Sequence, residues 1–161
     1  MRTVSGFVCG VLVGVFVHAG LAQERSGIAL NHVALAVENF PEASRFYSQV
    51  MGFPEAFTLR EPDGQPALTY FQVNRNTFIE LMPASKARPA GFVHIGLEVS
   101  DLEATVKRLR QGGMSVGDPG VSARTKSRIA VATTPQGTGV ELLEYGPESL
   151  QRKVMDAWKR P

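Results

Sequence analysis

Residues 31–40 read Asn-His-Val-Ala-Leu-Ala-Val-Glu-Asn-Phe, and the pattern returns at residues 93–102 as Val-His-Ile-Gly-Leu-Glu-Val-Ser-Asp-Leu. The offset from His32 to His94 gives the length of the repeat. Both stretches alternate branched aliphatic residues with small or polar ones, which is typical of a β-strand whose two faces meet different surroundings. A recurrence of this length predicts two copies of one structural unit.

Each copy of this strand is followed by a predicted helix that ends at glycine. The first helix is expected over residues 41–51, with Pro41 in the favoured first turn and Gly52 after the end. The second is expected to begin after Asp101, a good N-cap residue, with apolar residues at helical spacing until Gly113. The offset between the two terminating glycines is one less than that between the two histidines.

Three strand-like segments complete each copy. They cover residues 55–60, 68–73 and 77–82 in the first copy, and residues 115–116, 127–133 and 138–145 in the second. The last segments contain Ile79-Glu80-Leu81 and Val140-Glu141-Leu142, so that Glu141 repeats Glu80 at the same offset as the two glycines. Each copy is therefore a βαβββ module, and the fold class is α+β.

The repeat sets the predicted domain organisation. A single domain covers residues 28–146, with modules at 28–83 and 92–146 joined by a linker at 84–91 that is rich in alanine and proline. A C-terminal helix is predicted over residues 147–161. Its apolar stripe of Leu150, Val154 and Trp158 is more typical of a core or dimer contact than of a functional face.

The N-terminal segment, residues 1–22, is a different kind of sequence. Arg2 precedes an apolar run at residues 6–17, and small residues lead to Ala22. This pattern indicates a secretory signal peptide cleaved near Ala22, and hence a periplasmic or secreted protein; an uncleaved anchor is the alternative. The run is short for a bilayer span, so no stable membrane span is expected after processing. The only cysteine, Cys9, lies inside the run, which excludes cysteine chemistry in the mature chain.

The remaining composition is that of a globular protein without a nucleic-acid partner. Hydrophobic residues make up 43% and charged residues 20% of the chain. Arg2 is the only charged residue of the leader, so the mature chain keeps 17 − 1 = 16 basic against 15 acidic side chains. No basic cluster remains that would release counterions from nucleic acid.

Strand alternation places four potential metal ligands on one face of the predicted sheet. His32 and His94 lie on the face opposite the aliphatic residues of their strands. Glu80 and Glu141 likewise lie on the face opposite the aliphatic residues of their own strands. If the aliphatic faces pack on the helices, both histidines point away from the helix layer, among small residues. A single histidine or glutamate in a strand is usually an ordinary polar residue. Their recurrence in both copies favours a metal site, because two buried carboxylates without a cation would repel each other.

These motifs resemble the vicinal-oxygen-chelate (VOC) superfamily, also called the glyoxalase, bleomycin resistance and extradiol dioxygenase fold. The resemblance covers residues 28–146 and is strongest at 93–99 and 139–144. It implies two βαβββ modules that form a cupped mixed sheet with helices on the outer face. It also implies one divalent ion (Ni, Zn, Fe, Mn or Co). The residues that match the four ligand positions of the family are His32, Glu80, His94 and Glu141.

The complete ligand set most resembles bacterial glyoxalase I, the lactoylglutathione lyase. This resemblance implies a metal-dependent lyase or isomerase that abstracts a proton and stabilises an enediolate of a small oxygenated substrate. It makes Glu141 the stronger candidate for the base and Glu80 its counterpart. Extradiol dioxygenases need only two histidines and one glutamate, here His32, His94 and Glu141. Methylmalonyl-CoA epimerase resembles the chain in its opening Asn31 to Ala34, and metal-free small-molecule binding proteins of the same fold are a further alternative.

The sequence leaves the substrate and the assembly open. Glutathione and coenzyme A are chiefly cytosolic, whereas the pattern of residues 1–22 predicts export. The candidate partners for an anionic substrate, each more typical of a surface charge, are Arg45, Arg60, Arg124 and Arg128. The resemblance allows the two modules to share a cup within one chain or across a homodimer.

Overall fold

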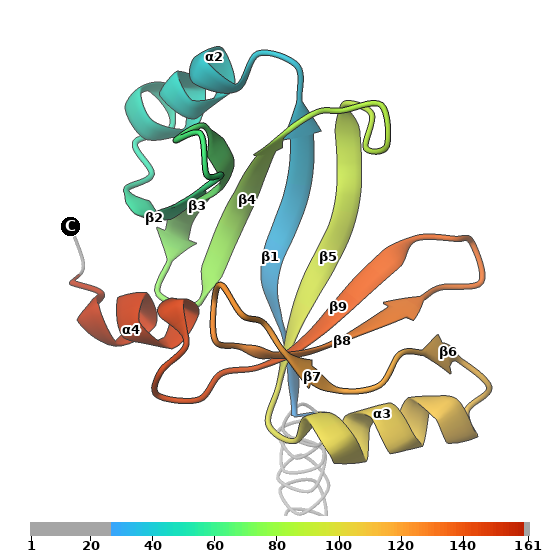
Figure 1. Ribbon diagram of the computed structural model, residues 1–161. Coiled ribbons are helices and arrows are strands. Elements are labelled where there is room, and N and C mark those ends of the chain that lie inside the picture. The colour runs from blue at the N-terminus through green and yellow to red at the C-terminus, as the bar shows by residue number, and fades with distance from the viewer. Residues whose placement is uncertain (1–26, 160–161) are drawn as a thin grey trace, which may run out of the picture.

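The computed structural model describes residues 27–159 (Figure 1). The predicted signal peptide at residues 1–22 lies outside the described residues. Within the described range, none of the helices has both the length and the apolar character that crossing a membrane requires.

The first module confirms the predicted order of elements. It runs through β1 (Ile28–Val37), α2 (Phe40–Arg45), η1 (Phe46–Val50), β2 (Glu55–Arg60), β3 (Pro66–Asn74) and β4 (Thr77–Pro83). The single helix predicted over residues 41–51 differs in detail, because α2 continues as the π-helical turn η1. Gly52 follows with a φ of 71°, a conformation that glycine adopts at little cost.

The second module repeats this order with one addition. It runs through β5 (Gly91–Val99), α3 (Leu102–Gln111), β6 (Ser115–Val116), β7 (Gly120–Val121), β8 (Arg128–Thr133) and β9 (Gly139–Glu144). The predicted N-cap is confirmed, since the Asp101 side chain accepts a hydrogen bond from the Ala104 backbone amide. The extra strand, β7, pairs with β8. No strand was predicted at Gly120–Val121.

The two modules join edge to edge in one nine-stranded mixed sheet. Its order is β2-β3-β4-β1-β5-β9-β8-β6, with β7 beside β8. The inner strands β1 and β5 pair antiparallel, while β4 runs parallel to β1 and β9 runs parallel to β5. The second half of the sheet therefore repeats the strand arrangement of the first half on the other side of the β1–β5 pair. Figure 1 shows β8 and β9 steeply inclined to β1 and β4, which is the twist that curves the sheet.

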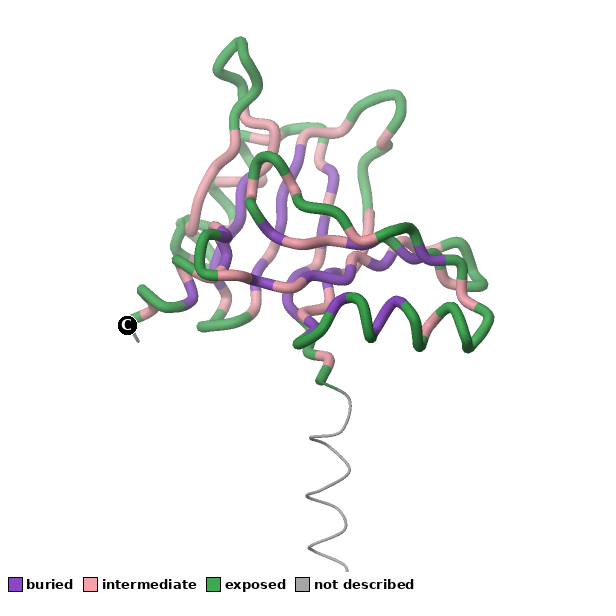
Figure 2. Tube along the Cα trace, turned by 60° about the horizontal axis from the view of Figure 1, so that its bottom comes forward, coloured by how far each residue is buried: buried purple, intermediate pink, exposed green. Residues whose placement is uncertain are grey.

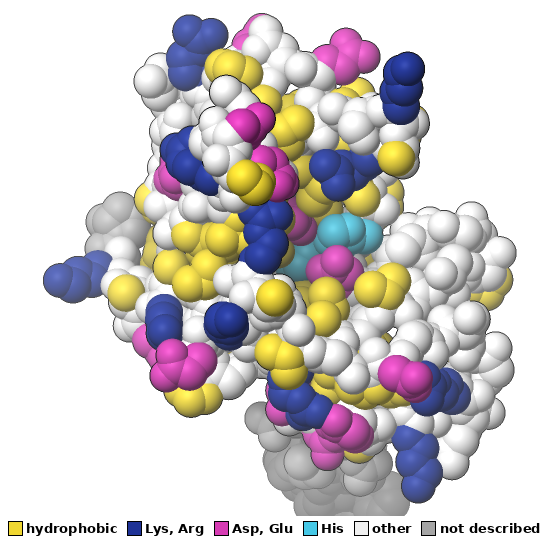
Figure 3. Space-filling view, viewed as in Figure 1, with side chains coloured by type: hydrophobic (Ala, Val, Ile, Leu, Met, Phe, Trp, Pro, Cys, Tyr) yellow, Lys and Arg dark blue, Asp and Glu magenta, His cyan; other side chains and the backbone are white. Residues whose placement is uncertain are grey.

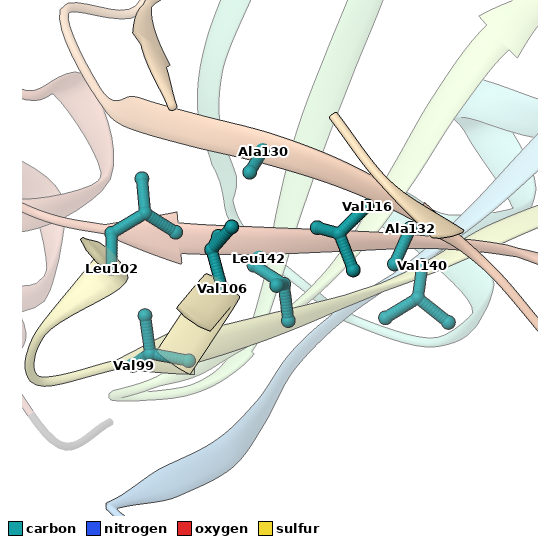
Figure 4. Packing of buried hydrophobic residues seen from close by; sticks show 8 residues of the cluster. All are labelled: Val99, Leu102, Val106, Val116, Ala130, Ala132, Val140 and Leu142. Atoms are coloured by element: carbon teal, nitrogen blue, oxygen red, sulfur yellow. The ribbon is translucent and has the colours of Figure 1, made fainter. Parts of the chain in front are cut away.

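Helix α3 covers the outer face of the second module, as the aliphatic stripe predicts. Figure 4 shows its side chains directed at the strands beneath it. The buried cluster consists of Val99, Leu102, Val106, Val116, Ala130, Ala132, Val140 and Leu142. Ile95 and Leu97 of β5 pack against this cluster. The aliphatic face of β5 is thus turned to the helix, and the face that carries His94 is turned away from it.

The outer face of the first module is covered less completely. Neither α2 nor η1 contains a buried residue, and Val33 and Leu35 of β1 are only partly buried. Tyr47 of η1 stacks on Phe71 of β3, with ring centroids 5.8 Å apart. The predicted helix layer therefore exists over both modules, but only that of the second module is tightly packed.

Helix α4 (Leu150–Ala157) packs at one end of the concave face. Its Met155 joins a buried cluster with Tyr70, Phe78, Leu143 and Tyr145, drawn from both modules. Figure 2 shows that burial is concentrated in the central strands and in the sides of the helices that meet them.

The predicted stripe on this helix is rotated by one residue. Leu150, Val154 and Trp158 are half-buried, whereas Gln151 and Met155 are buried. Gln151 takes an inside position because its Oε1 accepts a hydrogen bond of 2.9 Å from the buried Ser127 hydroxyl.

Candidate metal centre

The four residues singled out by the repeat meet on the concave face, within one chain. The Nε2 atoms of His32 and His94 are 3.0 Å apart. Oε2 of Glu80 lies 3.2 Å from each of these nitrogens. Oε2 of Glu141 lies 3.7 Å from Nε2 of His32 and 3.5 Å from Nε2 of His94. No second chain is needed to bring the four side chains together.

Strand register explains why these side chains converge. One cross-strand row contains Glu80, Ala34, His94 and Gly139, taken from β4, β1, β5 and β9 in that order. The neighbouring row on the same face contains Phe78, His32, Gly96 and Glu141 from the same strands. In each row the two potential ligands stand two strands apart with a small residue between them. Their side chains can therefore lean inward over that small residue and meet.

Gly96 is the small residue that the geometry requires most strictly. A Cβ atom at this position would lie 2.0 Å from Cε1 of His32. The equivalent atom at Gly139 would lie 3.4 Å from Cβ of His94, which is an ordinary contact. The expectation that small residues leave room for the histidines is thus confirmed at Gly96.

The distances and the donor types fit a divalent cation. Nitrogen and oxygen ligands about 2.0–2.2 Å from an ion are separated from one another by roughly 2.8–3.6 Å in tetrahedral or octahedral geometry. Oε2 of Glu80 is buried and has no hydrogen-bond partner among the described residues, despite its closeness to both imidazoles. A buried carboxylate oxygen without a partner is costly, and a cation at the centre of the four side chains would remove that cost.

The centre is more exposed to solvent at Glu141 and His94 than at His32 and Glu80. The exposed fraction of the side chain rises from 0% for His32 and 6% for Glu80 to 12% for His94 and 23% for Glu141. A cavity of about 140 Å³ reaches Glu80 and Glu141, with apolar walls that include Leu68 and Leu143. Figure 3 shows histidine side chains at the bottom of a hollow, beside acidic and basic groups. A small molecule would approach along the Glu141 side.

Among the four candidate arginines, only Arg124 lines this cavity. It donates hydrogen bonds to the Arg60 carbonyl oxygen at 2.9 Å and to Oε1 of Glu61 at 3.4 Å. Arg128 instead pairs with Glu103 and with Glu144. Arg60 bonds the Gly64 carbonyl oxygen, and Arg45 is exposed on α2.

Two residues beside the centre, Asn31 and Tyr145, were not predicted from the sequence to be part of the site. Oδ1 of Asn31 lies 3.1 Å from Nδ1 of His32 and accepts a hydrogen bond of 2.8 Å from the Tyr145 hydroxyl. Asn31 stands next to His32 in the repeated stretch, but Val93 occupies its place in the second copy. The repeat therefore gave no reason to single it out.

Burial and charge shift the ionisation of the site in opposite directions. Burial lowers the pKa of His32 from 6.5 to about 4, which outweighs the opposing charge of Glu80. Burial also acts to lower the pKa of His94, but close contact with Glu80 and the charges of Glu141 and Glu80 outweigh it and leave this pKa raised. Burial raises the pKa of Glu141, reinforced by Glu80 and opposed by His94. His32 is thus a neutral imidazole at physiological pH, ready to act as a ligand.

We predict that the two imidazoles of the metal-free protein titrate in separate steps. His32 binds its proton only as the pH falls toward about 4, and His94 binds its proton above pH 6.5. Because a ligand imidazole must be neutral, metal affinity falls as the pH drops through the pKa of His94. Histidine NMR spectra, assigned with His32→Gln and His94→Gln, measure both steps. Joint titration of the two rings near pH 6.5 would contradict this prediction.

We predict that Gly96→Ala displaces the His32 ring. The new methyl group overlaps ring atoms at 2.0–2.5 Å, and such overpacking typically costs about 1–3 kcal/mol. Metal affinity should fall by at least about 10-fold, as when a ligand loses its orientation. Gly139→Ala is the matched control and should change neither the metal affinity nor the free energy of unfolding much. Chelator competition and urea unfolding provide the measurements, and a Gly96→Ala protein with unchanged metal affinity would refute the required close approach.

Sequence comparison finds two relatives, one named as an epimerase and one as a probable lyase. An ethylmalonyl-CoA/methylmalonyl-CoA epimerase of Cereibacter sphaeroides is 33% identical over 111 residues, which cover 60% of this chain and 82% of the relative. A probable lactoylglutathione lyase of Synechocystis sp. is 28% identical over 123 residues, covering 71% of this chain and 94% of the relative.

Solved structures share the fold. Methylmalonyl-CoA epimerase from Mycobacterium tuberculosis superposes with a TM-score of 0.61 at 26% identity, covering 74% of this chain and 89% of the other. Methylmalonyl-CoA epimerase from Streptomyces coelicolor superposes with a TM-score of 0.61 at 19% identity, covering 74% and 96% of the two chains. A sequence model described as the Glyoxalase/Bleomycin resistance protein/Dioxygenase superfamily matches residues 29–142. The family resemblance of the repeated motifs is confirmed, and the chain belongs to the glyoxalase/bleomycin resistance protein/dioxygenase superfamily.

Proposed function

We propose that the protein is a divalent-metal-dependent isomerase or lyase that moves a proton at a carbon atom beside a substrate oxygen. Its four ligands would be His32, Glu80, His94 and Glu141, and the ion would be Ni, Zn, Fe, Mn or Co. The relatives support this proposal, since one is named an epimerase and another a probable lactoylglutathione lyase. The observation that carries it is that Oε2 of Glu80, buried without a hydrogen-bond partner among the described residues, lies 3.2 Å from Nε2 of both His32 and His94. Oε2 of Glu141 lies 3.5–3.7 Å from the same two nitrogens.

The protein and the ion would divide the chemistry between them. A bound divalent ion would supply Lewis-acid polarisation of the substrate oxygens. The chain would supply the base that accepts the carbon-bound proton and later returns it. The apolar part of the cavity lining, which includes Leu68 and Leu143, would limit the access of water to the reacting carbon, which strengthens the electrostatic interactions there.

Glu141 is the better placed of the two carboxylates to act as that base. Its side chain is 23% exposed, compared with 6% for Glu80, and its Oε2 is the farther of the two from both imidazoles. Burial raises the pKa of Glu141, which makes its carboxylate a stronger base than an ordinary glutamate. Glu80, held 3.2 Å from both Nε2 atoms, is better suited to remain a ligand throughout.

An iron-dependent dioxygenase is a second candidate, because three of the four residues form the set that such enzymes use. His32, His94 and Glu141 each present one atom within 4.8 Å of the others. The two-histidine, one-carboxylate set with open positions is typical of non-haem iron oxygenases. The closeness of Glu80 to both imidazoles disfavours this alternative, because a fourth ligand occupies a position that oxygen or substrate would need.

We also propose that the protein is exported, from the signal-peptide pattern of residues 1–22. Export bears on the substrate, because glutathione and coenzyme A are chiefly cytosolic. An exported enzyme would meet a different small molecule as its natural substrate, one with an oxygen on the carbon beside the reacting one. A coenzyme A thioester or a glutathione adduct therefore serves as a probe of the type of reaction and not as the natural substrate. Arg124 at the cavity lining could pair with an anionic group on that molecule, in exchange for its contact with Glu61.

Proton exchange with solvent tests this function with two named probes. The metal-loaded protein is incubated in D₂O with methylmalonyl-CoA and, separately, with the adduct of methylglyoxal and glutathione. We expect that at least one probe loses its carbon-bound proton signal, as monitored by ¹H NMR. Glu141→Gln should slow this exchange by about 10²-fold or more, the usual effect of losing a general base. It should keep most of its metal, whereas Glu80→Gln should lose metal.

Two outcomes would contradict the proposal. A protein with a full complement of metal that exchanges neither probe would reject proton transfer on both substrate types. A Glu141→Gln variant that exchanges as fast as the wild type would reject the assigned base. Oxygen uptake by the iron-loaded protein in the presence of catechol would favour the dioxygenase instead. Binding of a probe that survives alanine at both His32 and His94 would favour a metal-free binding protein.

A further inference from the structure

The two imidazoles of the centre are held differently, although the repeat makes them equivalent in sequence. Nδ1 of His32 lies 3.1 Å from Oδ1 of Asn31. The residue that corresponds to Asn31 in the second module is Val93, which has no side-chain acceptor. Within the part of the chain that the structure describes, Nδ1 of His94 forms no hydrogen bond. The symmetry of the two modules is therefore broken at the residue that precedes each histidine.

A backbone carbonyl fixes the orientation of the Asn31 amide. Nδ2 of Asn31 donates a hydrogen bond of 3.1 Å to the Asn76 carbonyl oxygen, which can only accept. Oδ1 must then be the atom that faces His32 and Tyr145, and it can only accept as well. The Tyr145 hydroxyl donates to it at 2.8 Å. Nδ1 of His32 must consequently carry the hydrogen, which leaves the lone pair on Nε2, directed at the cluster.

Burial makes this arrangement rigid. Asn31 and His32 are both 0% exposed, and Tyr145 is 8% exposed. Solvent is thus kept away from the amide, so it cannot readily replace a lost partner, and the buried groups depend on one another. The contact also links the two modules, because Asn31 and His32 lie on β1 while Tyr145 directly follows β9, the strand that carries Glu141.

We propose that Asn31 and Tyr145 are positioning residues that hold His32 as the Nδ1–H tautomer. They make His32 the ligand whose ring orientation is fixed through its second nitrogen, whereas Nδ1 of His94 has no such partner among the described residues. This inference rests on the metal centre of the proposed function but is independent of the reaction. Hydrogen bonds to the second nitrogen of a ligand histidine fix its tautomer and ring orientation, and their loss typically costs about 10- to 100-fold in metal affinity.

The test compares Asn31→Leu, Asn31→Asp and Tyr145→Phe with a matched control. Leucine removes the acceptor at similar size. Aspartate keeps an acceptor oxygen for both His32 and Tyr145 but loses the donor to the Asn76 carbonyl oxygen. Gln72→Leu is the control, because Gln72 is also a buried amide and its Nε2 donates to the Arg75 carbonyl oxygen at 3.1 Å. It lies on β3 and, unlike Asn31, forms no hydrogen bond with a described residue of the metal centre.

Two readouts separate positioning from plain stability. Long-range ¹H–¹⁵N spectra of the metal-free protein report the tautomer of each histidine, and zinc affinity is measured by competition with a chelator. We expect Nδ1–H at His32 in the wild type and in Asn31→Asp. Asn31→Leu should lose this tautomer and bind zinc about 10- to 100-fold more weakly. Tyr145→Phe should weaken zinc binding by a smaller factor, while His94 keeps its wild-type signals in all variants.

Equal behaviour of the Asn31, Tyr145 and Gln72 variants would overturn the inference. In that case all would lower stability to urea but leave the His32 tautomer and zinc affinity unchanged. If Asn31→Leu does not fold, Asn31→Asp and Tyr145→Phe decide the matter through the same two readouts. A wild type that binds zinc without moving a proton on any probe rejects the proposed reaction alone. A wild type that binds no zinc overturns the metal centre and this inference together.

Discussion

The centre depends first on the antiparallel pairing of β1 with β5, which sets His32 opposite Gly96 and Ala34 opposite His94. This register brings the Nε2 atoms of the two imidazoles to 3.0 Å from each other. A slip of one residue would turn every side chain of one strand to the opposite face and remove one histidine from the concave surface. The packing of α3 on the aliphatic face of β5 opposes such a slip, because the slip would expose Ile95 and Leu97. The core of the second module and the geometry of the site are thus held by the same alternation.

The electrostatics of the site follow from this crowding. Two carboxylates and two imidazoles lie together, and none of these four side chains is more than 23% exposed. Without a cation, His94 keeps a raised pKa beside the carboxylates, while burial keeps His32 neutral. A divalent ion would offset the repulsion between Glu80 and Glu141 and would give Glu80 Oε2 the partner it lacks among the described residues. The exposed fraction of the side chains rises from His32 to Glu141, so under the proposed function the ion would be held on the buried side and a substrate would reach it from the Glu141 side.

Much of this arrangement could be predicted because it repeats. The βαβββ modules, the glycine that ends each helix and the convergence of His32, Glu80, His94 and Glu141 are visible as paired patterns, and the structure has them. Features that occur once were missed or misplaced. The π-helical turn η1 has no sequence signature of its own. The buried stripe of α4 was shifted because the sequence cannot show that Ser127 satisfies Gln151. Asn31 and Tyr145 lie far apart in the chain, and only the folded register brings them together.

The central claim is that these four side chains bind one divalent ion. Elemental analysis of the purified protein, prepared without chelators, tests it most directly, alongside a variant with alanine at both His32 and His94. The expected result is about one divalent ion per wild-type chain and almost none in the variant. A folded wild-type protein that neither retains nor takes up Ni, Zn, Fe, Mn or Co, or a variant that binds as much as the wild type, would contradict it.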